Sequence, residues 1–145
     1  MSGLTYPMSF CGGAFVLEDQ RTREGAMDFK LRVDSDFEQA STVLVERLMA
    51  IRPTLAEHAC TSDDVDGCGE SSAGHAMTVP HLVEHLAIDF IVERRPSQTE
   101  PVAGYTVWLD HRHGLARVTI SSFDHAATEQ AVHDACLLLE REYRL

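Results

Sequence analysis

The chain has 145 residues, of which 44% are hydrophobic and 24% charged, so residues 1–145 fit one packed domain and exclude a disordered or fibrous protein. Its 23 acidic and 12 basic residues give a net charge of −11, which argues against a nucleic-acid partner and favours a cationic small molecule, peptide or polymer. No apolar run approaches the roughly 20 residues of a membrane span, and residues 1–13 lack the features of a secretory signal, so we expect a cytoplasmic protein that does not enter a membrane.

The N-terminal part of the chain predicts two strands and a helix. Residues 13–18 form a short apolar run, and residues 27–33 alternate apolar with charged side chains, which is typical of a half-buried strand. From residue 34 to residue 51 the apolar positions switch to helical spacing, and Pro53 prevents the helix from continuing.

The middle of the chain predicts a loop followed by a second helix. Residues 60–77 are polar and rich in glycine, so we expect a mobile loop there. Thr78 is placed to cap the helix, Pro80 is tolerated in its first turn, and Pro96 ends it.

The C-terminal part predicts a hairpin and a last helix. Residues 104–111 and 115–123 alternate apolar with polar side chains on either side of a short turn, and residues 127–143 carry an apolar stripe at helical spacing. The order strand, strand, helix, helix, strand, strand, helix predicts an α+β two-layer sandwich, in which a mostly antiparallel sheet of about four strands packs against three helices.

The second helix contains the sequence His-x-x-Glu-His, formed by His81, Glu84 and His85. Two imidazoles four residues apart lie one turn above another and can bind one zinc ion, and the positive end of the helix favours their neutral, ligating form. The glutamate stands where the inverzincin motif of zinc peptidases has the residue that activates water. The spacing therefore predicts a zinc site with His81 and His85 as ligands and Glu84 as the catalytic residue.

A simpler interpretation of the same helix is an amphipathic helix with a polar stripe. The motif also occurs by chance in proteins that bind no metal. In that case His81, Glu84 and His85 would form a polar stripe that faces water. A hydrolytic zinc site also needs a third protein ligand, which the motif does not identify. In either case the side chains expected to pack on the sheet are Leu82, Val83, Leu86, Ala87 and Phe90.

Three longer segments follow one another in the chain: PTLAEHAC at residues 53–60, PHLVEHLAIDF at residues 80–90 and GYTVWLDHRHGLARVTI at residues 104–120. Together with the last helix they resemble the N-terminal domain of cyanophycin synthetase, over about residues 27–140. The resemblance implies a domain that binds cyanophycin, a polyaspartate backbone bearing arginine side chains. In some members of that family the domain also cleaves this polymer through a metallopeptidase-like site.

The resemblance also implies roles for single residues. His81, Glu84 and His85 match the hydrolytic motif, His58 matches a histidine at the end of a helix, and Asp110 falls where the family's strand tends to carry an acid. An imidazole and a carboxylate both suit zinc, so His58 and Asp110 are rivals for the third ligand, and we favour His58. Without a metal, His58 would interact with the helix end and Asp110 would be an exposed hairpin residue.

The chain departs from the family in features that concern its activity. It has no G-x-x-x-x-G-K-[ST] loop and ends where a synthetase would continue into ATP-using domains, so we do not expect an ATP-dependent ligase on its own. A glycine pair in the family's loop is replaced by serine and aspartate, a glutamine after the helix motif is absent, and a basic loop has become residues 96–101. These departures bear on the substrate more than on the metal site.

The function that these patterns predict is zinc-dependent hydrolysis of a peptide or isopeptide bond in a cationic substrate that is arginine-rich or cyanophycin-like. One alternative is a non-catalytic module that binds a cationic polymer or peptide. The other is an accessory subunit of a separate ligase.

Overall fold

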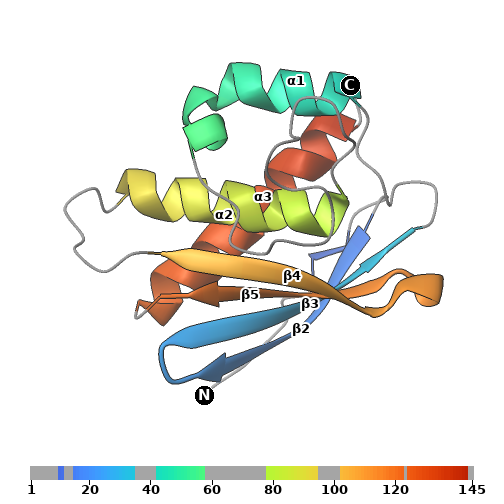
Figure 1. Cartoon of the computed structure of the whole chain (residues 1–145), viewed down its shortest axis with the longest axis vertical. Coiled ribbons are helices and arrows are strands. Elements are labelled where there is room, and N and C mark those ends of the chain that lie inside the picture. Colours follow the sequence, from blue (N-terminus) through green and yellow to red (C-terminus); the bar gives the residue numbers. More distant parts are fainter. Residues whose placement is uncertain are drawn as a thin grey trace.

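The computed structural model describes residues 10–11, 15–34, 42–57, 78–94, 102–122 and 124–143. They form one antiparallel sheet with helices on one of its faces, which confirms the α+β two-layer architecture (Figure 1). The strands lie in the order β1-β2-β3-β5-β4. Their bounds are β1 Phe10–Cys11, β2 Phe15–Arg23, β3 Ala26–Val33, β4 Ala103–Asp110 and β5 Leu115–Ser121. The helices are α1 (Thr42–Ile51), α2 (Val79–Arg94), α3 (His125–Tyr143) and the short 3-10 helices η2 (Pro53–Glu57) and η4 (His111–His113).

The strand β3 shows the alternation that its sequence predicts, and it pairs with β2 on one side and β5 on the other. The β3 side chains buried beneath the helices are Met27, Phe29, Leu31 and Val33. The neighbouring strand β2 continues beyond residue 18, where the predicted strand ended, as far as Arg23. Residues 18–23 are polar and bury little side-chain surface. They belong to the sheet because their backbone pairs with β3.

The hairpin between β4 and β5 closes through η4 and Gly114. Gly114 has φ 70°, and a Cβ at this position would collide with the carbonyl oxygen of Val33, so glycine fits both the conformation and the space. The backbone N–H of Val33 donates a hydrogen bond to the carbonyl of Gly114 at 2.8 Å. This bond ties the hairpin to the end of β3.

The helix starts depend on capping side chains. The hydroxyl of Thr78 accepts a hydrogen bond from the backbone N–H of His81 at 3.3 Å, which is the expected cap of α2. Asp124 caps α3 by accepting a hydrogen bond from the backbone N–H of Ala127 at 3.0 Å, so this helix begins at His125, slightly earlier than predicted.

Two predictions from the sequence fall partly or wholly outside the described residues. The first helix was expected from residue 34, and its described part, α1, ends at Ile51 before Pro53. The predicted start of that helix at residues 35–41 and the predicted loop at residues 60–77 lie outside the described residues.

The helix α2 lies in the middle of the molecule and is buried on all sides over most of its length. Every residue from Val79 to Asp89 is buried, the polar ones included. The reason is that α2 packs against α3 and η2 as well as against β4 and β5. None of the described helices is long and apolar enough to cross a membrane.

Candidate metal centre

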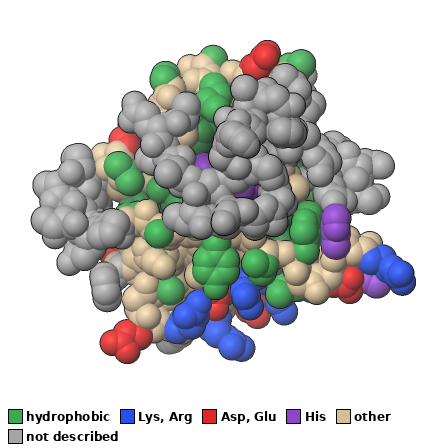
Figure 2. All heavy atoms as spheres, viewed as in Figure 1, with side chains coloured by type: hydrophobic (Ala, Val, Ile, Leu, Met, Phe, Trp, Pro, Cys, Tyr) green, Lys and Arg blue, Asp and Glu red, His purple; other side chains and the backbone are tan. Residues whose placement is uncertain are grey.

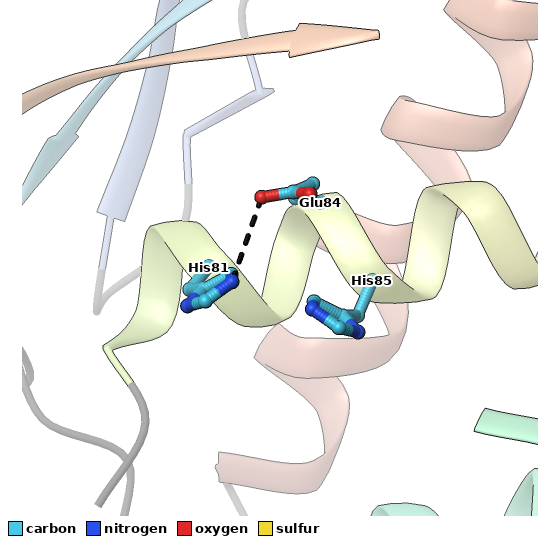
Figure 3. A group of neighbouring side chains, drawn as sticks. All are labelled: His81, Glu84 and His85. Carbon is cyan, nitrogen blue, oxygen red and sulfur yellow. Dashed lines mark ion pairs between the residues drawn. The ribbon is translucent and has the colours of Figure 1, made fainter. Parts of the chain in front are cut away.

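The first two turns of α2 bring the three polar side chains of the motif together. The ligand atoms of His81, Glu84 and His85 lie within 4.8 Å of one another. Nε2 of His81 is 3.7 Å from Oε1 of Glu84, and the two imidazole rings meet edge to face with centroids 4.8 Å apart (Figure 3). Two imidazoles and a carboxylate at this separation can hold a metal ion. In the part of the chain that the structure describes, no second group of three such residues gathers in this way.

All three side chains are buried, which excludes the interpretation of a stripe that faces water. The exposed fraction is 1% for His81 and Glu84 and 6% for His85. Burying a polar side chain is costly unless a hydrogen bond, an ion pair or a metal replaces the lost hydration. The polar atoms of the motif therefore have to be satisfied inside the protein.

Glu84 points toward the sheet, on the side that the sequence had assigned to apolar residues. The hydroxyl of Thr106 on β4 donates a hydrogen bond to Oε1 of Glu84 at 2.8 Å. Gly104 on the same strand leaves room for this approach, because a Cβ there would lie 3.2 Å from Cγ of Glu84 and 2.8 Å from the carbonyl oxygen of Thr119. No local pattern in the sequence connects Gly104 or Thr106 to α2, so neither residue could be assigned to the site from the sequence.

His81 is held in its neutral form by its surroundings. Burial lowers the pKa of His81 from 6.5 to about 4, because the charged ring would lose its hydration inside the protein. The imidazole is therefore neutral at pH 7, which is the form that binds a metal.

A second buried acid, Asp89, lies one turn beyond His85 on α2. Its carboxylate accepts a hydrogen bond from Nε of Arg52 at 2.7 Å and another from the hydroxyl of Thr54 at 2.6 Å. These two bonds tie α2 to the start of η2. Asp89 continues the helical spacing of His81 and His85, and that spacing is the signal from which the sequence could have identified it.

The two rivals for the third ligand have different places in the chain. His58 directly follows η2 and lies outside the described residues. Asp110 lies at the end of β4, where it forms an ion pair with His113 at 2.8 Å and its side chain is 47% exposed. The hydrogen bond from His113 holds the pKa of Asp110 below its usual value. Asp110 is four positions beyond Thr106, roughly 13 Å along the strand, and is not one of the residues gathered around His81.

Comparisons with known proteins give this chain no relative. A scan against family models, a search of curated proteins and a search of solved structures each found no match. The likeness to the N-terminal domain of cyanophycin synthetase therefore rests on the segments quoted above and stays a prediction.

Proposed function

We propose that this protein is a metal-dependent hydrolase whose site is the group His81, Glu84 and His85. The observation that carries the proposal is the convergence of two imidazoles and one carboxylate, all buried, within 4.8 Å on one helix. Nitrogen and oxygen ligands of this kind suit zinc better than magnesium or calcium, which prefer oxygen ligands alone.

In this proposal the residues of α2 have different roles. The rings of His81 and His85 bind the metal, and the carboxylate of Glu84 accepts a proton from the attacking water. Thr106 donates a hydrogen bond to one carboxylate oxygen of Glu84, which orients the carboxylate and leaves its other oxygen to accept the proton. A bound zinc ion would polarise the substrate carbonyl and make water easier to deprotonate.

The proposed substrate is a cationic peptide or polymer cleaved at a peptide or isopeptide bond. The net charge of −11 favours a positively charged ligand, and the resemblance to the cyanophycin synthetase domain supports an arginine-rich one. The same resemblance favours His58 over Asp110 as the third ligand. The exposed ion pair of Asp110 with His113 also argues for His58.

The first test is the metal content of protein purified without a histidine tag, measured by mass spectrometry. We expect about one zinc ion per chain in the wild type and a loss of zinc in His81→Ala and His85→Ala. His133→Ala on α3 is the matched control and should keep the metal. Wild-type protein that stays free of zinc after incubation with the ion would contradict the metal site.

The second candidate function is a non-catalytic module in which the same site has a structural role. The observation that favours it is the burial of Glu84, since structural zinc sites are closed to water and catalytic ones keep an open position. Zinc-loaded wild type and Glu84→Gln separate the two candidates when both are incubated with arginine-rich peptides. Cleavage by the wild type alone supports the hydrolase, whereas zinc binding without cleavage supports the module.

A further inference from the structure

The helices cover one face of the sheet and leave the other face without a helix (Figure 1). The strand register places two rows of side chains across this second face. Residues directly opposite each other in neighbouring strands point to the same face, so the strand register defines each row. One row consists of Asp19, Lys30, Arg117 and Val107. The next row consists of Arg21, Asp28, Thr119 and Tyr105.

The first row places two positive charges side by side. Lys30 of β3 lies directly opposite Arg117 of β5, and like charges in this position destabilise a sheet. Arg21 stands on the next strand, one row away. Among the described carboxylates, none forms an ion pair with Arg21, Lys30 or Arg117, and Nε of Arg117 is shielded from solvent without a hydrogen bond. Asp19 of β2 lies directly opposite Lys30 on its other side and is the one acid in this row, so the row carries two positive charges and one negative charge.

The acid of the next row, Asp28, lies directly opposite Arg21 and already has hydrogen-bond partners. Asp28 accepts hydrogen bonds from Nε and Nη2 of Arg23 at 3.0 and 3.1 Å and from the hydroxyl of Thr119 at 2.8 Å. The hydrogen bond from Arg23 is the main reason that the pKa of Asp28 lies below its usual value. Arg117 lowers the pKa of Asp28 further through its charge, although the two side chains form no ion pair.

A cavity of about 230 Å³ opens between these rows. Its lining includes three basic side chains, Arg21, Lys30 and Arg117, and two carboxylates, Asp19 and Asp28. The strand pairing is irregular on both flanks, between Leu17 and Asp19 in β2 and between Trp108 and Asp110 in β4. β-Bulges of this kind re-aim side chains and are frequent beside functional sites.

The charge of this face differs from that of the chain as a whole. The basic side chains on it are Arg21, Arg23, Lys30, Arg32 and Arg117, and the acidic ones are Glu18, Asp19, Asp28 and Asp110. Five positive and four negative charges leave the face slightly positive, although the chain carries −11. Figure 2 shows lysine and arginine side chains gathered along the lower side of the molecule, over the strands. An anion is therefore repelled less on this face than the net charge of the chain suggests.

We propose that this cavity is a binding site for a small oxyanion, a phosphate or carboxylate group held by Lys30, Arg117 and Arg21. Guanidinium and ammonium groups form their strongest hydrogen bonds with such groups, and the bound anion removes the repulsion between Lys30 and Arg117. The site lies on the face of the sheet opposite α2. It therefore does not depend on the proposed metal centre.

The experiment is a titration of the full chain, labelled with ¹⁵N, with inorganic phosphate at constant ionic strength and pH, followed by NMR. We expect saturable shifts of amide signals in β2, β3 and β5. Lys30→Met and Arg117→Met, which keep apolar stems, should each weaken binding at least about tenfold. Arg141→Met on α3 is the matched control and should bind like the wild type. A parallel titration with succinate distinguishes a carboxylate site from a phosphate site, and sodium chloride measures the general salt effect.

A second measurement separates binding from a purely structural role. Without phosphate, Lys30→Met should melt at about the same temperature as the wild type, because it removes the repulsion with Arg117 together with the attraction to Asp19. With phosphate, the wild type should gain thermal stability and Lys30→Met should not. Wild-type shifts that do not saturate, or equal phosphate affinity in the wild type and both variants, would overturn the proposal.

Discussion

At the level of single residues, the hydrogen bond from Thr106 supports a carboxylate that is 1% exposed. Thr106→Val keeps the shape of the side chain and removes the donor. We expect a loss of about 1–3 kcal/mol in the free energy of unfolding, since the buried carboxylate of Glu84 loses the hydrogen bond from this hydroxyl. Thr106→Ser keeps the hydroxyl and should lose less. Urea unfolding of both variants measures the difference, and equal losses would mean that the hydroxyl contributes nothing.

The low pKa of His81 predicts how the stability of the metal-free protein depends on pH. The ring has a pKa of about 4 when folded and 6.5 when unfolded, so protonation favours the unfolded chain. The contribution of neutral His81 to the free energy of unfolding is fully present above pH 6.5. It is lost as the pH falls from 6.5 to 4, by about 3 kcal/mol in total.

The measurement is urea unfolding in the presence of a chelator at several pH values. His81→Gln cannot gain this proton, so its stability should fall less steeply over the same range. Parallel pH profiles for the wild type and His81→Gln would refute the assignment.

The sequence identified part of the site at this scale. His81, Glu84 and His85 are visible because their spacing is local to one helix. Thr106 and Gly104 are not visible, because the pairing of β4 with β5 and the packing of α2 decide which strand faces Glu84.

At the level of the elements, the hydrogen bonds that Asp89 accepts from Arg52 and Thr54 connect α2 to the start of η2. Asp89→Ala leaves the guanidinium of Arg52 without its buried partner, and we expect a loss of about 3–5 kcal/mol in the free energy of unfolding. Glu93 is the matched control, since it pairs with the same Arg52 at 2.9 Å but is 58% exposed. Glu93→Ala should therefore cost less than about 1 kcal/mol.

Chemical denaturation of both variants tests this difference. Similar losses in Asp89→Ala and Glu93→Ala would show that burial does not set the strength of the pair.

The elements themselves were predictable where burial decides them. The alternation in β3 and the cap at Thr78 gave the correct strand and helix start. The polar half of β2 could not be found in this way, because its place is set by the partner strand and not by its own side chains.

At the level of the whole molecule, the order of strands and helices was sufficient to predict the two layers. It was not sufficient to predict that α2 lies at the centre, with α3 and η2 against its other sides. A helix with apolar and polar residues around its whole circumference looks amphipathic in sequence, and only the packing of distant segments shows that it is buried.

Metal binding should stabilise the whole fold, since the site lies inside it. Zinc at about 100 times its dissociation constant should add about 2.7 kcal/mol, which corresponds to roughly 5–10 °C in melting temperature for a chain of this size. A chelator should reverse the gain. His85→Ala should show no gain, and an equal shift in that variant would place the metal elsewhere.

The burial of α2 also affects how fast a bound metal ion can leave the site. Ligands that are 1–6% exposed on a helix enclosed by a sheet and by other helical segments can be reached only when the protein opens around them. The rate at which zinc leaves would then be set by the frequency of this opening and not by the strength of the metal–ligand bonds. Extraction by a chelator should accordingly reach a rate that no further increase in chelator concentration can raise.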